Sequence, residues 1–218
     1  MTKIRKRVLV LGTLVGLAIS AVIGGWAYAV SNVEQPKYVT VEQDGLIEIR
    51  DYPSLIVAEV TRRGDRGAAV RQGFSPLAQY IFAKDRGGES VSMTAPVMQE
   101  RQAIEMTAPV TLPQVNAVDS NWTVRFIMPA KYTLATLPKP GSNDVHIAEV
   151  PAMRRAAIRF SGIATDGSIA ANQQILSAWL KSRNLTPLGE PTFAYYNDPF
   201  TPGALRRNEV MFDIKTAP

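Results

Sequence analysis

The chain has 218 residues, 46% hydrophobic and 20% charged, so it can bury enough apolar surface to fold and does not have the composition of a disordered protein. It contains no cysteine, which excludes disulfides, thiolate metal sites and cysteine nucleophiles. Four of the 24 Lys and Arg lie at the extreme N-terminus and the other 20 are balanced by 19 Asp and Glu, so nucleic-acid binding is not expected.

An uncharged apolar run of 23 residues, VLVLGTLVGLAISAVIGGWAYAV at 8–30, follows the basic cluster Lys3–Arg7. A helix of that length rises about 35 Å, which is enough to span a hydrocarbon core of about 30 Å. Basic flanks stay in the cytoplasm. We therefore expect a single-pass transmembrane helix with a cytoplasmic N-terminus and a domain on the exported, periplasmic or extracellular, side.

The same run has a second interpretation as a cleaved signal peptide. Ala27-Tyr28-Ala29 fits the small-x-small pattern of a cleavage site, and cleavage after Ala29 would give a secreted domain. Cleavable apolar regions are typically about 7–15 residues long, so we favour the retained anchor. Both interpretations export the domain.

Small residues recur every four positions in the run, at Gly12, Gly16, Ser20 and Gly24. They would share one face of the helix and allow an anchor-mediated dimer, although small residues are also common in membrane helices that do not associate.

The folded domain is predicted at 38–215, after a linker at 31–37. Tyr38–Val41 and Leu46–Ile49 alternate around an Asp-Gly pair, which is typical of a β-hairpin. After a Tyr-Pro break, Leu55–Val60 is expected to form a third strand.

The first helix of the domain is predicted to begin after Asp65, a residue type that favours N-caps. Its apolar stripe has helical spacing: Val70, Phe74, Leu77 and Ile81. A Gly-Gly pair at 87–88 marks its expected end, and Pro76 predicts a kink or a late start.

Three strands are expected in the proline-rich stretch that follows, at Val91–Met98, Ala103–Leu112 and Trp122–Met128. Later elements are strands at Val145–Val150 and Arg154–Phe160, a helix capped by Thr165 or Asp166 and ending before Asn184, and strands at Phe193–Tyr196 and Glu209–Ile214. The order strands, helix, strands occurs twice, which predicts an α+β fold of two similar halves.

The residues of common catalytic sites are scarce. His146 is the single histidine, and no nucleophile elbow, phosphate loop or metal-ligand spacing is present. Two carboxylates that are distant in the sequence can still be brought together by folding to form a catalytic pair, but we do not expect an enzyme. His146 alternates with Val145 and Ile147 on a predicted strand, so its side chain should point away from their face.

A repeated pentapeptide is the most unusual feature of the sequence. MTAPV occurs at Met93–Val97 and again at Met106–Val110. Proline removes a ladder donor at the same place in both copies, which suits sheet edges, bulges or the lip of a groove. We favour a structural role for the pair over direct ligand contact.

These motifs resemble the SOUL family of haem-binding proteins, in order, over roughly residues 38–214. The resemblance rests on the MTAPV pair, Phe126–Pro129, Leu137–Pro140, Arg159–Gly162, Tyr196–Phe200 and Arg206–Val210. It implies a distorted, mostly antiparallel β-barrel of two similar halves with a helix outside each, and an apolar groove for haem or another tetrapyrrole beside the first helix.

The groove helix of the family corresponds to Arg66–Phe82 here. The resemblance makes Arg71, Phe74, Leu77, Ala78 and Phe82 the candidate contacts, with Arg71 paired to a propionate. Phe74 and Leu77 also belong to the stripe that any amphipathic helix buries, so a core role is equally expected for them. The segment Arg206–Glu209 is expected to be a structural, hydrogen-bonded tail.

Iron ligation is a separate question, because some members of the family hold haem largely by apolar contact. His146 is either an axial ligand or an exposed histidine, and Met93, Met106 or a tyrosine are other candidate ligands. We expect a membrane-anchored tetrapyrrole-binding protein for buffering, transfer or sensing. The alternatives are a module that binds a lipid, another apolar molecule or a peptide, and, least favoured, a tetrapyrrole-modifying or lipid-modifying enzyme.

Overall fold

The computed structural model describes residues 33–102 and 120–215. The predicted membrane span at 8–30, the strand expected at 103–112 and the second MTAPV lie outside these residues. Within the described ranges, no helix is both long enough and apolar enough to cross a bilayer.

The described elements include nine strands and two α-helices. In chain order they are β1 (Val39–Asp44), β2 (Ile47–Tyr52), β3 (Leu55–Arg63), α2 (Arg66–Ile81), β4 (Val97–Arg101), β5 (Asn121–Ile127), β6 (His146–Val150), β7 (Met153–Phe160), α3 (Asp166–Ser182), β8 (Thr192–Tyr195) and β9 (Asn208–Ile214), with a short 3-10 helix η2 (Gly203–Leu205) before β9. This confirms the predicted α+β class.

All nine strands belong to one sheet of order β1-β2-β7-β9-β8-β4-β5-β3-β6, and neighbouring strands pair antiparallel. With β1 left aside, the two halves match in chain order: β2, β3, α2, β4 and β5 of the first half correspond to β6, β7, α3, β8 and β9 of the second. With this correspondence, the strand order of the sheet reads the same from either edge. Two similar halves, predicted from element order, are therefore visible in the topology.

The halves exchange their first strands. β2 of the first half pairs with β7 of the second, and β6 of the second half pairs with β3 of the first. Each half thus completes the sheet of the other, and the central β4–β8 pairing joins them. Folding one half alone would leave two strand edges unpaired, which couples the halves into one cooperative unit.

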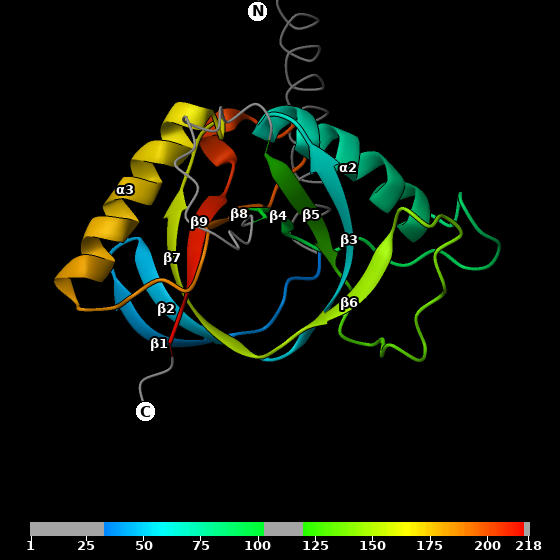
Figure 1. The fold of residues 1–218 in the computed structure, drawn as a ribbon, viewed down its shortest axis with the longest axis horizontal. Coiled ribbons are helices and arrows are strands. Elements are labelled where there is room, and N and C mark those ends of the chain that lie inside the picture. Colours follow the sequence, from blue (N-terminus) through cyan, green and yellow to red (C-terminus); the bar gives the residue numbers. More distant parts are fainter. Residues whose placement is uncertain (1–32, 103–119, 216–218) are drawn as a thin grey trace, which may run out of the picture. The chain divides into compact units, whose positions relative to one another are not determined.

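The expected barrel is not closed. In the described part of the chain, β1 and β6 are the two edges of the sheet and do not pair with each other. Figure 1 shows the sheet curled, with α3 outside β7 and β9 and α2 outside β3 and β5. A curled sheet of twisted strands satisfies every ladder except at its edges, so closure is not needed to bury the core.

Local signals placed the helix starts correctly. The Asp65 carboxylate accepts a hydrogen bond from the Ala68 amide at 2.8 Å, and the Thr165 hydroxyl accepts one from the Ser168 amide at 3.2 Å. These bonds satisfy amides that have no partner inside the helix. In the β1–β2 hairpin, Gly45 has a φ of +60°, which explains the Asp-Gly signal.

Most strand ends differ from the prediction by one to three residues, and β4 and α2 differ more. The strand expected at 91–98 begins only at Val97, because Pro96 cannot donate to a ladder. Before it, Thr94 forms an isolated bridge with Glu34. Helix α2 ends at Ile81, before the Gly-Gly pair, and continues through Pro76 without ending there.

The helices cover one face of the sheet with apolar side chains. Under α3 the core contains Ile49, Ile158, Ile169, Leu176, Leu180, Val210 and Phe212, and under α2 it contains Val60, Leu77, Tyr80, Ile81, Val124 and Phe126. A third cluster on the other face includes Val57, Met98, Ile127, Ala194 and Met211.

A buried charged cluster lies beside this third group. The Nη1 and Nη2 atoms of Arg50 donate to the Glu209 carboxylate at 2.7 and 3.0 Å, its Nε donates to Glu48 at 2.7 Å, and the Arg50 and Glu209 side chains are almost fully buried. The Tyr196 hydroxyl donates to the same carboxylate at 2.7 Å, and Arg207 donates to it at 2.7 and 3.0 Å. The predicted hydrogen-bonded tail is confirmed, with Arg50 as its partner.

Candidate functional site

An apolar stripe lies on the exposed side of α2. Phe74 and Phe82 keep 39% and 50% of their surface exposed, and Ala78 between them is half-buried. The three residues are four positions apart, so they lie on one face of the helix. Arg71, one turn before Phe74, is exposed at the end of the same face. We call these four residues the α2 stripe.

Leu77, the fifth predicted contact, does not belong to this surface. It is fully buried and packs in the core cluster that contains Val60 and Val124. For Leu77 the core interpretation, which the sequence left equal to ligand contact, is therefore the one that the structure supports. Phe74 combines the two roles. The centroid of its ring lies 5.2 Å from that of the buried Phe126 in an edge-on arrangement, while part of the Phe74 ring stays exposed.

The height of α2 above the sheet is set by Gly73. A Cβ at that position would lie 2.7 Å from the Val124 Cγ2 and 3.0 Å from the Val60 Cγ2. Near the end of the helix, the Tyr80 hydroxyl donates to the Pro138 carbonyl oxygen at 2.8 Å. These contacts fix the helix on β3 and β5, so the α2 stripe is presented by a rigid element.

Arg71 supplies the positive charge at one end of the α2 stripe. Among residues 33–102 and 120–215, its side chain has no hydrogen-bonded or ion-pair partner, unlike Arg66 in the same helix, which pairs with Asp166. A guanidinium without a carboxylate partner can form a bidentate bond with an anionic group of a ligand.

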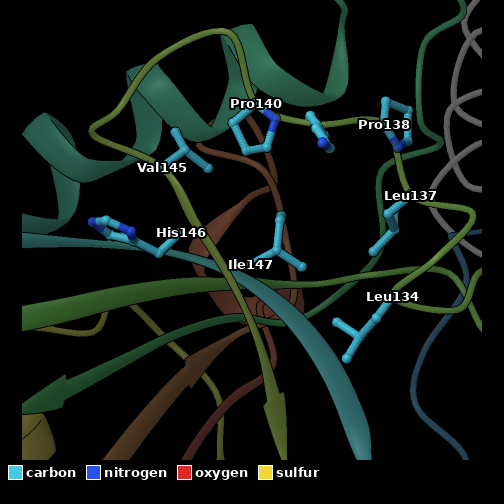
Figure 2. A pocket seen from close by; sticks show the side chains of 8 residues that line it. Leu134, Leu137, Pro138, Pro140, Val145, His146 and Ile147 are labelled. Carbon is cyan, nitrogen blue, oxygen red and sulfur yellow. The ribbon is translucent and has the colours of Figure 1, made fainter.

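A pocket of about 350 Å³ lies between β6 and the loop at 134–140. Six of its eight lining residues have apolar side chains, and the eight are Leu134, Leu137, Pro138, Lys139, Pro140, Val145, His146 and Ile147. Figure 2 shows Ile147 lying across from Leu134 and Leu137. The volume is at the lower end of the range for small-molecule sites.

His146 points away from the apolar side of this pocket, as Figure 2 shows. Val145 is buried and Ile147 packs against the core under α2, whereas His146 is exposed. The predicted alternation is therefore confirmed. The prediction of an axial ligand at His146 stays a prediction, and no group of three or more His, Asp or Glu within the described ranges could hold a metal ion.

The first MTAPV copy has its polar groups bonded within the fold. The Ala95 amide donates to the Glu34 carbonyl oxygen at 2.9 Å, and the Thr94 hydroxyl bonds the Ile127 carbonyl oxygen. Met93 stays exposed. These contacts support the structural role expected for this copy.

Sequence reasoning missed Arg50 as the partner of the tail. The available signal was the polar alternation of Glu48, Arg50 and Tyr52 on a strand whose other face is apolar. Such alternation is also typical of a solvent-facing strand, so it could not reveal burial.

Comparisons with known proteins define the fold and the family. A family model described as SOUL heme-binding protein matches residues 33–213. No curated protein matches the chain.

Solved structures match at low identity. The EcmrR C-terminal domain aligns with a TM-score of 0.59 and 12% identity, covering 78% of this chain and 98% of that one. A hydrolase encoded by lin2189 from Listeria innocua aligns with a TM-score of 0.54 and 11% identity, covering 78% of this chain and 91% of that one. At these identities the likeness shows the fold alone and carries no information about activity.

Proposed function

This chain belongs to the SOUL haem-binding protein family, and on that premise we propose that its domain binds haem or another tetrapyrrole on the α2 stripe. We further propose that residues 8–30 anchor the protein in a membrane and that the domain lies on the exported side. Buffering, transfer or sensing of the tetrapyrrole are the roles that such a protein would serve.

The exposure of Phe74 and Phe82 is the observation that carries the proposal. The two rings are eight residues apart, about 12 Å along the helix, and stand on either side of the small Ala78. A flat macrocycle laid along this face would remove apolar surface from water, which contributes about 25 cal/mol per Å². Arg71 at the end of the stripe would pair with a propionate.

Binding on the α2 stripe does not depend on His146. The stripe lies on the helix that covers β3 and β5, while His146 faces the other side of strand β6 from Val145 and Ile147. We therefore propose that haem and iron-free porphyrin bind with similar affinity. This is a binding role, as the family description states for its members, and it needs no catalytic group.

The pocket beside β6 favours a second candidate function, the binding of a smaller apolar molecule. Its volume of about 350 Å³ and the apolar side chains of six of its eight lining residues support this alternative. Leu134 is half exposed and lines the pocket, so Leu134→Arg would block it without removing a core side chain.

Titration of the full-length protein in detergent, with haem and with protoporphyrin, tests the proposal. Phe82→Ser should weaken the binding of both ligands about three- to tenfold, because about half of the Phe82 surface is left to bury and full burial of such a side chain contributes about 1.5–3 kcal/mol. Ile175→Ser on α3 is the matched control, since Ile175 is 54% exposed and lies on the other helix.

Two results would contradict the proposal: unchanged porphyrin binding in Phe82→Ser, or no binding by the unmodified protein. Loss of binding in Leu134→Arg with unchanged binding in Phe82→Ser would move the site to the β6 pocket.

A further inference from the structure

Three large apolar side chains are exposed at one end of the sheet. Phe200 is 90% exposed, and Leu205 and Ile163 are each 64% exposed. They lie in two connections, β7 to α3 and β8 to β9, which meet where the Gly162 amide donates to the Gly203 carbonyl oxygen at 3.0 Å. We call this surface the apolar tip.

The polar groups of the tip are bonded internally. The Asp198 carboxylate accepts hydrogen bonds from the Phe200 amide and from the amide and hydroxyl of Thr201, at 2.7 to 3.1 Å. Arg206 donates to the Thr201 carbonyl oxygen at 2.8 Å and to the Pro199 carbonyl oxygen. Because these groups already have partners, the tip could enter an apolar environment at a lower desolvation cost.

The chain enters the folded domain at the same end of the sheet. Arg207, next to Arg206, donates to the Gln35 side-chain oxygen at 3.3 Å, and the Glu34 carbonyl oxygen accepts from the Ala95 amide. Across the sheet, the start of β4 aligns with the end of β8, and the end of β8 aligns with the start of β9. The entry point and the tip are therefore neighbours.

Chain length then limits how far this entry point can lie from a membrane. Val30, the last residue of the apolar run, is five residues before Gln35. Five extended residues span at most about 17 Å. If a bilayer holds the run at 8–30, this length is the upper limit on the distance between Gln35 and the end of the run.

We propose that the apolar tip, Ile163, Phe200 and Leu205, inserts into the interfacial region of the bilayer that anchors the chain. Interfacial burial of large apolar side chains is how peripheral segments add to a membrane anchor. This inference rests on the anchoring part of the proposed function and is independent of tetrapyrrole binding. It gives the domain a fixed orientation on the membrane surface.

The absence of native cysteine makes a direct test practical. Phe200→Cys, Leu205→Cys and the control Ser182→Cys would each carry a polarity-sensitive fluorophore in the full-length protein. Ser182 is exposed at the far end of α3, about 24 Å along the helix from Asp166. The proteins are reconstituted in phosphatidylcholine–phosphatidylglycerol vesicles with or without nitroxide-labelled lipid.

Labels at 200 and 205 should show blue-shifted emission and quenching by the nitroxide lipid, and the label at 182 should show neither. Equal, water-like emission at all three sites in protein that resists carbonate extraction would overturn the tip inference while leaving the anchor intact. Equal quenching at all three would also overturn it. Extraction of the protein by carbonate would overturn both the anchor and the tip, without bearing on porphyrin binding.

Discussion

Arg50 and Glu209 are 159 residues apart in the chain and form a bidentate ion pair in the interior, at 2.7 and 3.0 Å. The pair joins β2 to β9 across β7, which lies between them in the sheet. Glu209 also receives bonds from Tyr196 and Arg207, so the carboxylate is fully satisfied. The segment Arg206–Glu209 is thus bonded within the fold through Glu209 and Arg207.

Removing the charge of Glu209 should strongly destabilise the domain. Glu209→Gln leaves the buried Arg50 with Glu48 as its remaining carboxylate partner among the described residues, and breaking a buried pair costs up to about 3–5 kcal/mol. The free energy of unfolding, measured by urea titration, checks this. The control is Asp144→Asn, which removes an exposed pair with Arg62 and should cost less than about 1 kcal/mol. Similar losses in the two variants would contradict the prediction.

The same carboxylate predicts acid sensitivity. Burial pushes the pKa of Glu209 up, but the hydrogen bond and charge of Arg50, with Arg207 and Tyr196, hold the pKa below its ordinary value. A carboxylate with a lowered folded pKa stabilises the fold above its unfolded pKa of about 4.3, and that contribution is lost as the pH falls through the folded value. Stability should therefore decline below about pH 4.

Unfolding measured against pH in Glu209→Gln tests this linkage. The decline should be shallower in the variant, although Asp51 and Asp144 also have pKa values lowered by arginine partners and should retain part of it. Identical slopes for the variant and the unmodified protein would show that Glu209 does not contribute.

A methyl group at Gly73 should displace α2. The added Cβ would lie 2.7 Å from the Val124 Cγ2, and overpacking costs about 1–3 kcal/mol. Gly67→Ala is the control, because its Cβ would meet the flexible end of Arg71 at 3.3 Å. Urea unfolding should show a loss for Gly73→Ala and little change or a gain for Gly67→Ala. A Val124→Ala background should reduce the loss only in part, because the Val124 Cβ would still lie 2.9 Å from the added methyl group. Equal effects of Gly73→Ala and Gly67→Ala would contradict the close-packing argument.

Arg71→Ala should weaken protoporphyrin binding at least about tenfold, because a hydrogen bond to a charged group is worth about 1.5–3 kcal/mol. The dimethyl ester of the porphyrin, which has no carboxylate, should bind both proteins equally. Gln72→Ala, an exposed neighbour on the same helix, serves as the control variant. Equal loss for the diacid and the ester would argue against a propionate contact.

His146→Ala should leave the haem absorption band and the affinity unchanged, since His146 is exposed and does not lie on the α2 stripe. Its free energy of unfolding should change by less than about 0.5 kcal/mol, as for other surface positions. A shift of the band on mutation would instead identify His146 as the axial ligand.

Much of the local structure was predictable because short-range interactions determine it. Asp65 and Thr165 cap the helices with bonds to amides three residues ahead, and Gly45 supplies the positive φ of the hairpin. Helical spacing also placed Phe74 and Leu77 near one face of α2. It could not decide that Leu77 is fully buried while Phe74 stays partly exposed, because this depends on which strands lie beneath the helix.

The sequence by itself therefore determined the family, the α+β class, the helix starts and the side of its strand on which His146 lies. Tertiary structure alone decided the exchange of β2 and β6 between the halves, the open edge of the sheet, and the burial of Arg50 against Glu209. The strand exchange and the ion pair join residues that are 87 (Glu59 and His146) to 159 (Arg50 and Glu209) positions apart. Their free energy appears only once the intervening chain has folded and excluded water. No local pattern carries that information.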